Sequence, residues 1–212
     1  MDFTKKDSRI FSRKSLVQRI ILNIKRARLK SLGRVIFGEN LMILGGLPIC
    51  KTPREGRILI GDNVTLNSDK LHSNSALTSA VKLTTGYNGV INIGNNSILN
   101  GSCIVAYDKV DIGSCCEIAS CTIITDTDFH PVDPGERLKQ MKGDLFSFDT
   151  VNKKPVKIGN NCWIGYGAII LKGSTIGNNC IVGAGAVIPG NLSFPDNCVI
   201  AGNPAKIVKM LK

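Results

Sequence analysis

Histidine is the side-chain type best suited to proton transfer near neutral pH, and this 212-residue chain has two, of which His130 is the stronger candidate. It lies in the segment DFHPVD, with Asp126 and Asp128 just before it. A neutral imidazole accepts protons near neutral pH, and a neighbouring carboxylate can orient the ring. The plainer alternatives are a polar residue at the edge of a loop and two solvated carboxylates. We take His130 as a candidate general base, and we expect His72, in KLHSNSAL, to be structural or at the surface.

Metal and disulfide chemistry receives less support from the sequence. The chain has eight cysteines and two histidines, and no two cysteines are spaced C-x-x-C. We therefore expect no metal site and reduced thiols in a cytoplasmic protein, and a disulfide or metal among Cys50, Cys115 and Cys121 stays open as the alternative. The remaining five cysteines occupy one position of a repeat, where they would pack as small apolar fillers: Cys103, Cys116, Cys162, Cys180 and Cys198.

That repeat sets the elements that must position His130. From Ile158 to Ile200 an apolar residue recurs every six positions, often followed by Gly and, four places later, by a small residue. A period of six fits neither an α-helix nor simple two-residue alternation. It fits a coil of three short strands with a turn after each. The earlier members of the repeat are Ile60, Leu66, Ile93, Leu99, Val105, Ile112, Ile118 and Ile124.

The turns of the repeat place Gly and Asn where the chain must bend, in IGDN at 60–63 and in IGNN at 93–96, 158–161 and 176–179. Turns that are 18 residues apart should lie one above the other. We therefore expect two ladders, one of Cys162, Cys180 and Cys198, and one of Asn161, Asn179 and Asn197.

His130 occupies the position where the next aliphatic after Ile124 would fall. The repeat is then absent over about residues 131–155 and resumes at Ile158. An insertion of that length in a regular coil is typical of a lid or an acceptor-binding loop.

Residues 56–208, and most specifically KPVKIGNNCWIG to AGNPAKIV, resemble the hexapeptide-repeat acyltransferases of the sugar and xenobiotic branch. The resemblance implies an all-β, left-handed parallel β-helix that assembles as a homotrimer and uses acetyl coenzyme A. We accordingly expect a basic helical arm and lead-in at 1–55 and an acyltransferase domain at 56–212. Within that domain we expect the inserted loop and a short C-terminal helix at about 204–211.

The same resemblance assigns roles to residues. His130 would remove the proton from an acceptor hydroxyl, and Asp126 or Asp128 would orient the ring or bind the sugar. A backbone N–H near Gly165 or Tyr166 would bind the oxyanion. The family's cation after GAGA is missing from IPGNLSFPDN, so the phosphates would depend on Lys206, with Lys172 or a neighbouring subunit as further candidates. The residues expected at the coenzyme are Trp163, in a cleft between subunits, Gly165, Tyr166, Ala184, Gly185, Pro189 and Lys206.

The function that the resemblance implies is acetyl transfer from acetyl coenzyme A to a sugar hydroxyl, on a surface polysaccharide or other glycan precursor. Two alternatives stay open, the N-acetylation of an amino sugar and a non-catalytic β-helical scaffold.

The N-terminal arm carries most of the chain's positive charge. Residues 1–34 contain eleven Lys or Arg and two Asp, which accounts for +9 of the net +11. This asymmetry argues against a nucleic-acid-binding body. No apolar run reaches 18 residues. We expect a helix that packs on the body, on a partner subunit or peripherally on the inner membrane, through Leu16, Val17, Ile20, Ile21 and Ile24.

Overall fold

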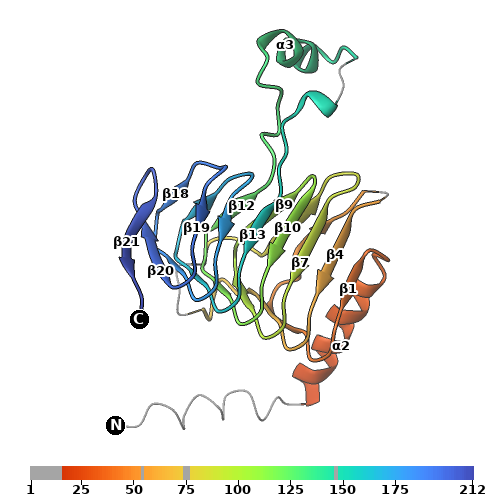
Figure 1. The fold of residues 1–212 in the computed structure, drawn as a ribbon. Helices are drawn as coiled ribbons and strands as arrows, with labels where there is room; N and C mark the ends of the chain where they lie inside the picture. Colours follow the sequence, from red (N-terminus) through yellow and green to blue (C-terminus); the bar gives the residue numbers. More distant parts are fainter. Residues whose placement is uncertain (1–15, 54, 74–76, 146–147) are drawn as a thin grey trace.

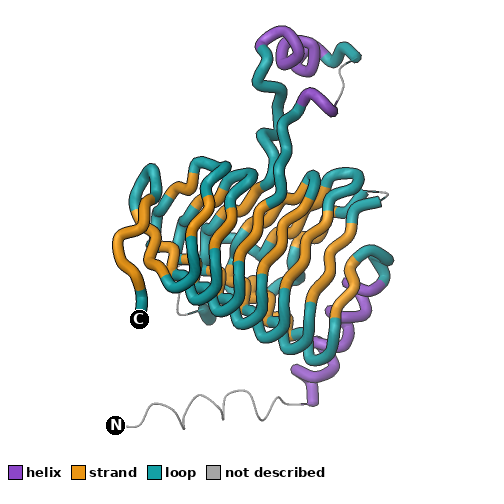
Figure 2. Tube along the Cα trace, viewed as in Figure 1, coloured by secondary structure: helices purple, strands orange, loops and turns teal. Residues whose placement is uncertain are grey.

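The computed structural model describes residues 16–53, 55–73, 77–145 and 148–212. Over these residues the chain winds into a coil whose strands stack in three parallel sheets (Figure 1). One helix lies at the N-terminal end of the coil, and one long insertion projects from its side (Figure 2). The prediction of a parallel β-helix is confirmed, and its left-handed winding stays a prediction.

Each turn of the coil except the last contributes one strand to each of the three sheets, which we name A, B and C in chain order. Sheet A contains β1 (Val35–Phe37), β4 (Arg57–Ile60), β7 (Val90–Ile93), β10 (Lys109–Ile112), β13 (Val156–Ile158), β16 (Thr175–Ile176) and β19 (Ser193–Phe194). Sheet B contains β2 (Met42–Gly45), β5 (Thr65–Ser68), β8 (Ile98–Asn100), β11 (Glu117–Ile118), β14 (Trp163–Ile164), β17 (Ile181–Val182), β20 (Cys198–Ala201) and β21 (Lys206–Met210). Sheet C contains β3 (Ile49–Lys51), β6 (Lys82–Thr85), β9 (Cys103–Ala106), β12 (Ile123–Thr125), β15 (Ile169–Ile170) and β18 (Val187–Ile188).

The repeated aliphatic residues fill the interior of the coil, because one side chain of each short strand points inward. Ile158 pairs with Ile176 in the next turn, and both are buried. The two predicted ladders are present as well. Asn179 accepts a side-chain hydrogen bond of 2.9 Å from Asn161, and the Sγ atoms of Cys180 and Cys198 lie 3.6 Å apart.

Asn and Gly are favoured at the corners of the coil for different reasons. Asn161 and Asn179 have φ of 53° and 56°, a left-handed conformation that Asn tolerates better than most residues. At Gly159 the requirement is space, since a Cβ there would lie 2.7 Å from the carbonyl carbon and oxygen of Gly177. Glycine at this position therefore allows adjacent turns to stack at strand spacing.

The β-helix begins earlier than the expected residue 56. Its first turn is formed by β1, β2 and β3, and β1 pairs with β4 through Val35 and Ile58. Large side chains obscure the repeat in this turn, because Leu41 occupies a buried position that small residues fill later in the chain.

Cys103 departs from the predicted ladder. It is partly exposed, and it pairs with exposed Lys82 and exposed Ile123 in sheet C, while Ile104 points into the core. The phase of the repeat therefore shifts by one residue after Leu99. Inside the coil, Cys116, Cys162, Cys180 and Cys198 are buried, as expected of small fillers.

The predicted C-terminal helix is wrong, because this segment forms β21. β21 runs antiparallel to β20, with a register shift between Val199 and Ile200. An isolated helix of this length would be marginal in water. As a strand, the segment pairs with backbone groups of β20 at the end of sheet B.

Helix α2 (Leu16–Lys30) lies against β1 and β2 of the first turn. Only Leu22 and Leu29 of the helix are buried, whereas all five residues of the predicted apolar stripe are exposed. The stripe therefore does not pack on the body of its own chain. Among the described residues, no helix is both long and apolar enough to span a membrane. The rest of the arm, residues 1–15, lies outside the described residues.

Candidate functional site

His130 is exposed and lies at the base of the insertion, just after β12. The insertion leaves the coil at the edge where sheet C passes to sheet A and returns at β13. It contains helix α3 (Pro134–Lys142) and the 3₁₀ turn η1 (Phe148–Thr150), and it stands well clear of the coil (Figure 1). The expected insertion at 131–155 is therefore present, with a helix of its own.

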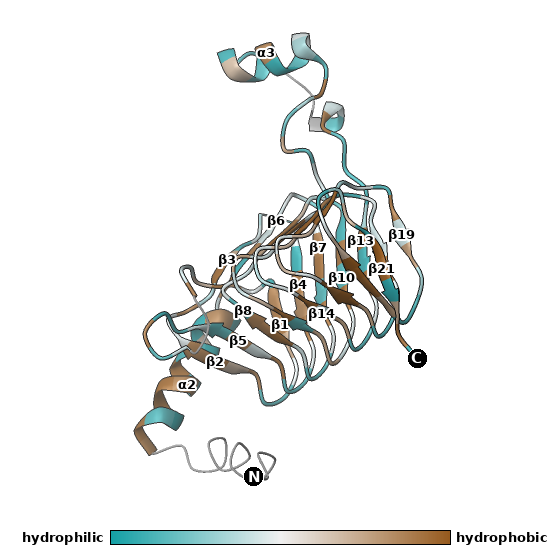
Figure 3. Ribbon diagram, turned by 90° about the vertical axis from the view of Figure 1, so that its left-hand side faces the viewer, coloured by the Kyte–Doolittle hydropathy of each residue, from teal (hydrophilic) through white to brown (hydrophobic). Residues whose placement is uncertain are grey.

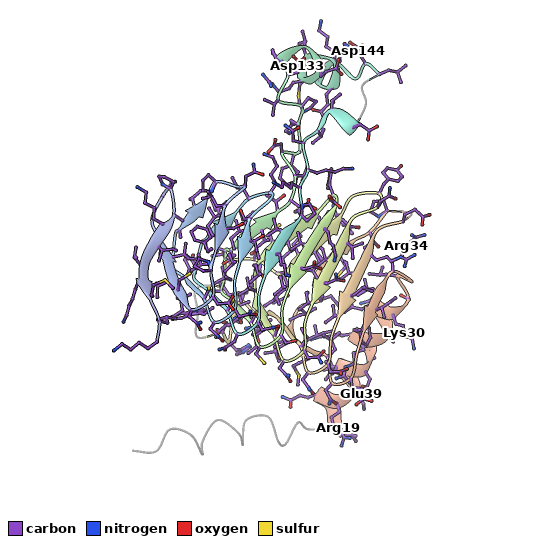
Figure 4. The ribbon with its side chains drawn as sticks, in the orientation of Figure 1. Arg19, Lys30, Arg34, Glu39, Asp133 and Asp144 are labelled. Atoms are coloured by element: carbon purple, nitrogen blue, oxygen red, sulfur yellow. The ribbon has the colours of Figure 1, made fainter. Side chains whose placement is uncertain are left out.

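Local sequence signals fix both ends of α3. Asp133 caps its N-terminus by accepting a 2.9 Å hydrogen bond from the Glu136 amide, and Pro134 begins the helix. Gly143 ends it with φ of 76° and donates to the carbonyl of Gln140. Figure 4 labels Asp133 and Asp144 on this projecting element. These caps fix where α3 begins and ends, and Gln140 lies in its last turn.

Gln140 is the ring partner of His130. Its Oε1 lies 2.9 Å from His130 Nδ1. An amide oxygen only accepts hydrogen bonds, so Nδ1 carries the proton in this contact. Nε2 of the neutral ring is then the atom that can accept a proton. The sequence alone did not indicate Gln140 as a partner, because the contact joins His130 to a residue ten positions later on helix α3 and depends on how that helix is placed.

Asp126 has a structural role and does not orient the ring. Its side chain is buried, and its two oxygens accept hydrogen bonds of 2.7 Å from the amides of Tyr107 and Asp108. Burial raises the pKa of the Asp126 carboxyl, although these backbone hydrogen bonds oppose the shift. The expectation that Asp126 meets the ring or a sugar hydroxyl is therefore wrong, because both its oxygens are occupied inside the coil.

Asp128 is also paired away from the ring. Its carboxylate forms an ion pair with Lys172, and its carbonyl accepts a 2.7 Å hydrogen bond from the His130 amide. The backbone of Asp128 therefore orders the turn that carries His130, while its side chain joins this turn to the next turn of the coil. Lys172 is occupied by Asp128, which weakens its candidacy for the coenzyme phosphates.

Phe129 adopts a conformation that is unusual for a bulky side chain. Its φ of 62° lies in the left-handed region, immediately before the candidate base. Two contacts support it: Thr127 Oγ1 accepts a 3.1 Å hydrogen bond from the Phe129 amide, and the Phe129 ring packs edge-on against Tyr107, with centroids 6.1 Å apart. The coil thus holds the chain reversal that directs His130 toward the insertion.

A cavity of about 300 Å³ lies beside the same edge of the coil. It is bounded by turns of the first three coils and by the returning limb of the insertion, and Lys153 in that limb bridges to Thr127. The buried Thr85 hydroxyl in its wall has no hydrogen-bond partner. The lining residues are Pro53, Thr85, Gly86, Tyr87, Asn88, Tyr107, Asp149, Val151 and Lys153. The cavity therefore offers aromatic and polar groups together.

The predicted coenzyme residues lie elsewhere on the same chain. Trp163 is 54% exposed on β14 in sheet B. Gly165, Tyr166, Ala184 and Gly185 lie at the edge between sheets B and C, whereas Pro189 follows β18 at the edge that carries His130. Lys206 is exposed on β21. A single chain therefore does not bring His130 together with Trp163 and Tyr166.

The backbone narrows the choice of oxyanion donor. The Gly165 amide donates a 2.7 Å hydrogen bond to the Val182 carbonyl in the next turn of the coil. Because the Gly165 amide is already used in hydrogen bonding between turns of the coil, the Tyr166 amide remains the candidate oxyanion donor. Within the described residues, no group of three or more His, Cys, Asp or Glu side chains is placed to hold a metal ion.

A hollow of about 950 Å³ is an open groove that follows sheet A along its whole length. Ile36 of β1, Asp111 of β10 and Lys157 of β13 are among its lining residues. It contains neither His130 nor any predicted coenzyme residue. Its size therefore does not identify it as the site of chemistry.

Comparisons with known proteins agree with this architecture. Residues 155–190 match the family described as bacterial transferase hexapeptide (six repeats). A protein of Dictyostelium discoideum named as an acetyltransferase is 40% identical over 134 residues, which cover 63% of each chain. The polysialic acid O-acetyltransferase of Neisseria meningitidis is 35% identical over 152 residues, 66% of this chain and 59% of that protein. The chain thus spans about three fifths of the length of these relatives.

Among solved structures, a hexapeptide-repeat acetyltransferase from Vibrio cholerae, in complex with acetyl coenzyme A, aligns with a TM-score of 0.51 and 25% identity. The alignment covers 64% of this chain and 69% of that one.

Proposed function

We propose that the chain, whose residues 155–190 match the hexapeptide transferase family, is an acetyltransferase that moves an acetyl group from acetyl coenzyme A to a sugar hydroxyl. The observation that carries the proposal is the contact of His130 Nδ1 with Gln140, which leaves Nε2 as the ring nitrogen that can face an acceptor at the base of a projecting insertion. The Vibrio cholerae structure with acetyl coenzyme A supports the choice of donor. The polysialic acid enzyme supports a glycan acceptor and a role in polysaccharide biosynthesis.

In the proposed reaction, His130 Nε2 takes the proton from the acceptor hydroxyl as its oxygen attacks the thioester carbonyl. A carbon–oxygen bond forms, and the carbonyl oxygen becomes an oxyanion that accepts a hydrogen bond from the Tyr166 amide. The oxyanion then collapses, the carbon–sulfur bond breaks, and the imidazolium returns its proton to the departing thiolate. The products are an acetyl ester and free coenzyme A.

A homotrimer would complete this site. His130 lies at the edge between sheets C and A, whereas Trp163 and Tyr166 lie on sheet B and its edge with sheet C. A neighbouring copy that presents its sheet B edge to His130 would bring the two sets together, and threefold symmetry would repeat this contact in a closed ring. The coenzyme would then run along the neighbour's turns past Ala184 and Gly185, and Lys206 would meet its phosphates.

The acceptor sugar, in this proposal, enters the cavity of about 300 Å³ beside the insertion. A pyranose presents apolar C–H faces that stack on aromatic rings such as Tyr87 and Tyr107, and hydroxyls that pair with buried polar groups. The contact between the Phe129 and Tyr107 rings links this cavity to the turn that carries His130.

The decisive experiment measures release of the coenzyme thiol from acetyl coenzyme A with a panel of sugars. His130→Ala should lower turnover about 10²-fold or more, whereas His72→Ala on an exposed turn should leave it unchanged. Thiol release that is insensitive to His130→Ala would favour the scaffold alternative. Mass spectrometry of the product distinguishes the other alternative, since an amide on an amino sugar would replace the ester. A monomeric mass in solution would contradict the shared site.

A further inference from the structure

Helix α2 presents its apolar side to the solvent. Leu16 is 73% exposed, Ile20 is 50% exposed and Ile24 is 55% exposed. Val17 and Ile21 extend the same stripe and are also exposed. These five aliphatic residues follow the helical repeat, so they form one continuous surface along the first half of the helix.

The side of α2 that faces the body is held by both polar and apolar contacts. Lys25 donates to the carbonyl of Gly45, and Arg26 Nε donates to the carbonyl of Leu41 at 2.7 Å. Leu22 and Leu29, on the side opposite the stripe, are the buried aliphatic residues of the helix. The helix is therefore fixed in an orientation that points its apolar stripe outward, the reverse of an ordinary surface helix.

The charges beside the apolar stripe favour an anionic surface as its binding partner. Residues 16–30 contain five Lys or Arg and no acidic residue. Arg19 and Lys30 are exposed and lie only about 20° apart around the helix axis, at ~100° per residue; Figure 4 labels both on α2. They flank the stripe on one side, and exposed Arg28 lies beyond its C-terminal end. A second copy of α2 would bring the same charges against them, whereas anionic phosphates would neutralise them.

We propose that α2 is an interfacial anchor that binds an anionic lipid bilayer. The helix would lie in the plane of the interface, with the aliphatic stripe at the boundary of the acyl chains and the flanking cations on lipid phosphates. The insertion that carries His130 projects away from α2 in both Figure 1 and Figure 3, so bilayer contact leaves it accessible. The proposal is independent of the reaction that the chain catalyses.

The test uses the full chain and sedimentation with vesicles of phosphatidylcholine, with or without an equal amount of phosphatidylglycerol. We expect binding to the anionic vesicles, little binding to phosphatidylcholine alone, and release as salt rises from 0.1 M to 1 M. The double variant Ile20→Ser, Ile24→Ser should weaken binding about tenfold or more. Leu71→Ser, which changes an 88% exposed aliphatic on a turn of the coil, is the matched control and should bind as the parent does.

Equal vesicle binding by the double variant and the parent would overturn the proposal, as would absence of binding to anionic vesicles. A change of oligomeric state in the double variant, measured by analytical ultracentrifugation, would assign the stripe to a contact between copies instead. Because Ile20 and Ile24 are exposed, both variants should keep the parent's melting temperature, which separates lost binding from lost folding.

Discussion

The contact between His130 and Gln140 gives a quantitative prediction for Gln140→Ala. The contact is 2.9 Å long and lies at the protein surface, where a hydrogen bond contributes about 0.5–1.5 kcal/mol. If the proposed reaction depends on the ring orientation that this bond provides, losing it should lower kcat by roughly two- to twelvefold, at 1.36 kcal/mol for each factor of ten. The KM for acetyl coenzyme A should change little, because Gln140 is not among the predicted coenzyme residues. Steady-state thiol release measures both constants.

Gln140→Glu provides a readout that a purely structural role would not move. A carboxylate about 4 Å from the imidazolium stabilises it by about 1 kcal/mol in water, which corresponds to about 0.7 pH unit. The acid limb of the pH–rate profile should therefore move upward by about that amount. Met141→Ala is the matched control, since Met141 is exposed on the same turn of α3.

Two results would refute this reasoning. Unchanged kcat in Gln140→Ala, together with an unshifted profile in Gln140→Glu, would mean that another group orients His130. An equal loss of kcat in Met141→Ala would mean that displacement of α3, and not the loss of one hydrogen bond, explains the effect.

Three further predictions concern the coil. Burial raises the pKa of the Asp126 carboxyl above its ordinary 3.8, so the parent protein loses stability as pH rises through the pKa of this group in the folded state. Asp126→Asn should lower the free energy of unfolding in urea melts by about 1–3 kcal/mol. The difference between parent and variant should be largest below pH 4 and shrink above it. Gly159→Ala should lower stability by about 1–3 kcal/mol in the same assay, because its Cβ meets backbone of the next turn. In timed thiol labelling at pH 8, Cys121 should react well before Cys50, because a hydrogen bond with Thr78 lowers the pKa of the first thiol and burial raises that of the second to about 11.

Predictions from the repeat succeeded where one turn repeats the chemistry of the next. The aliphatic positions around Ile158 and Ile176, and the Asn ladder through Asn179, are formed as the six-residue period predicts. They failed where side-chain size or pairing at the ends of the coil decides the structure. Leu41 obscured the first turn, and residues 206–210 became a strand because β20 offered unpaired backbone groups.

For the candidate site, too, the features that depend on local sequence were predictable and those that depend on long-range contacts were not. The sequence by itself determined that the chain coils and that an insertion interrupts the coil at His130, because period and turn residues are local properties. Only the tertiary structure decided that Gln140 holds the ring, that Asp126 is used to cap a neighbouring turn, and that the stripe of α2 faces outward. Each of these depends on which carbonyl, amide or side chain another part of the chain brings within hydrogen-bonding distance, and no periodicity records that.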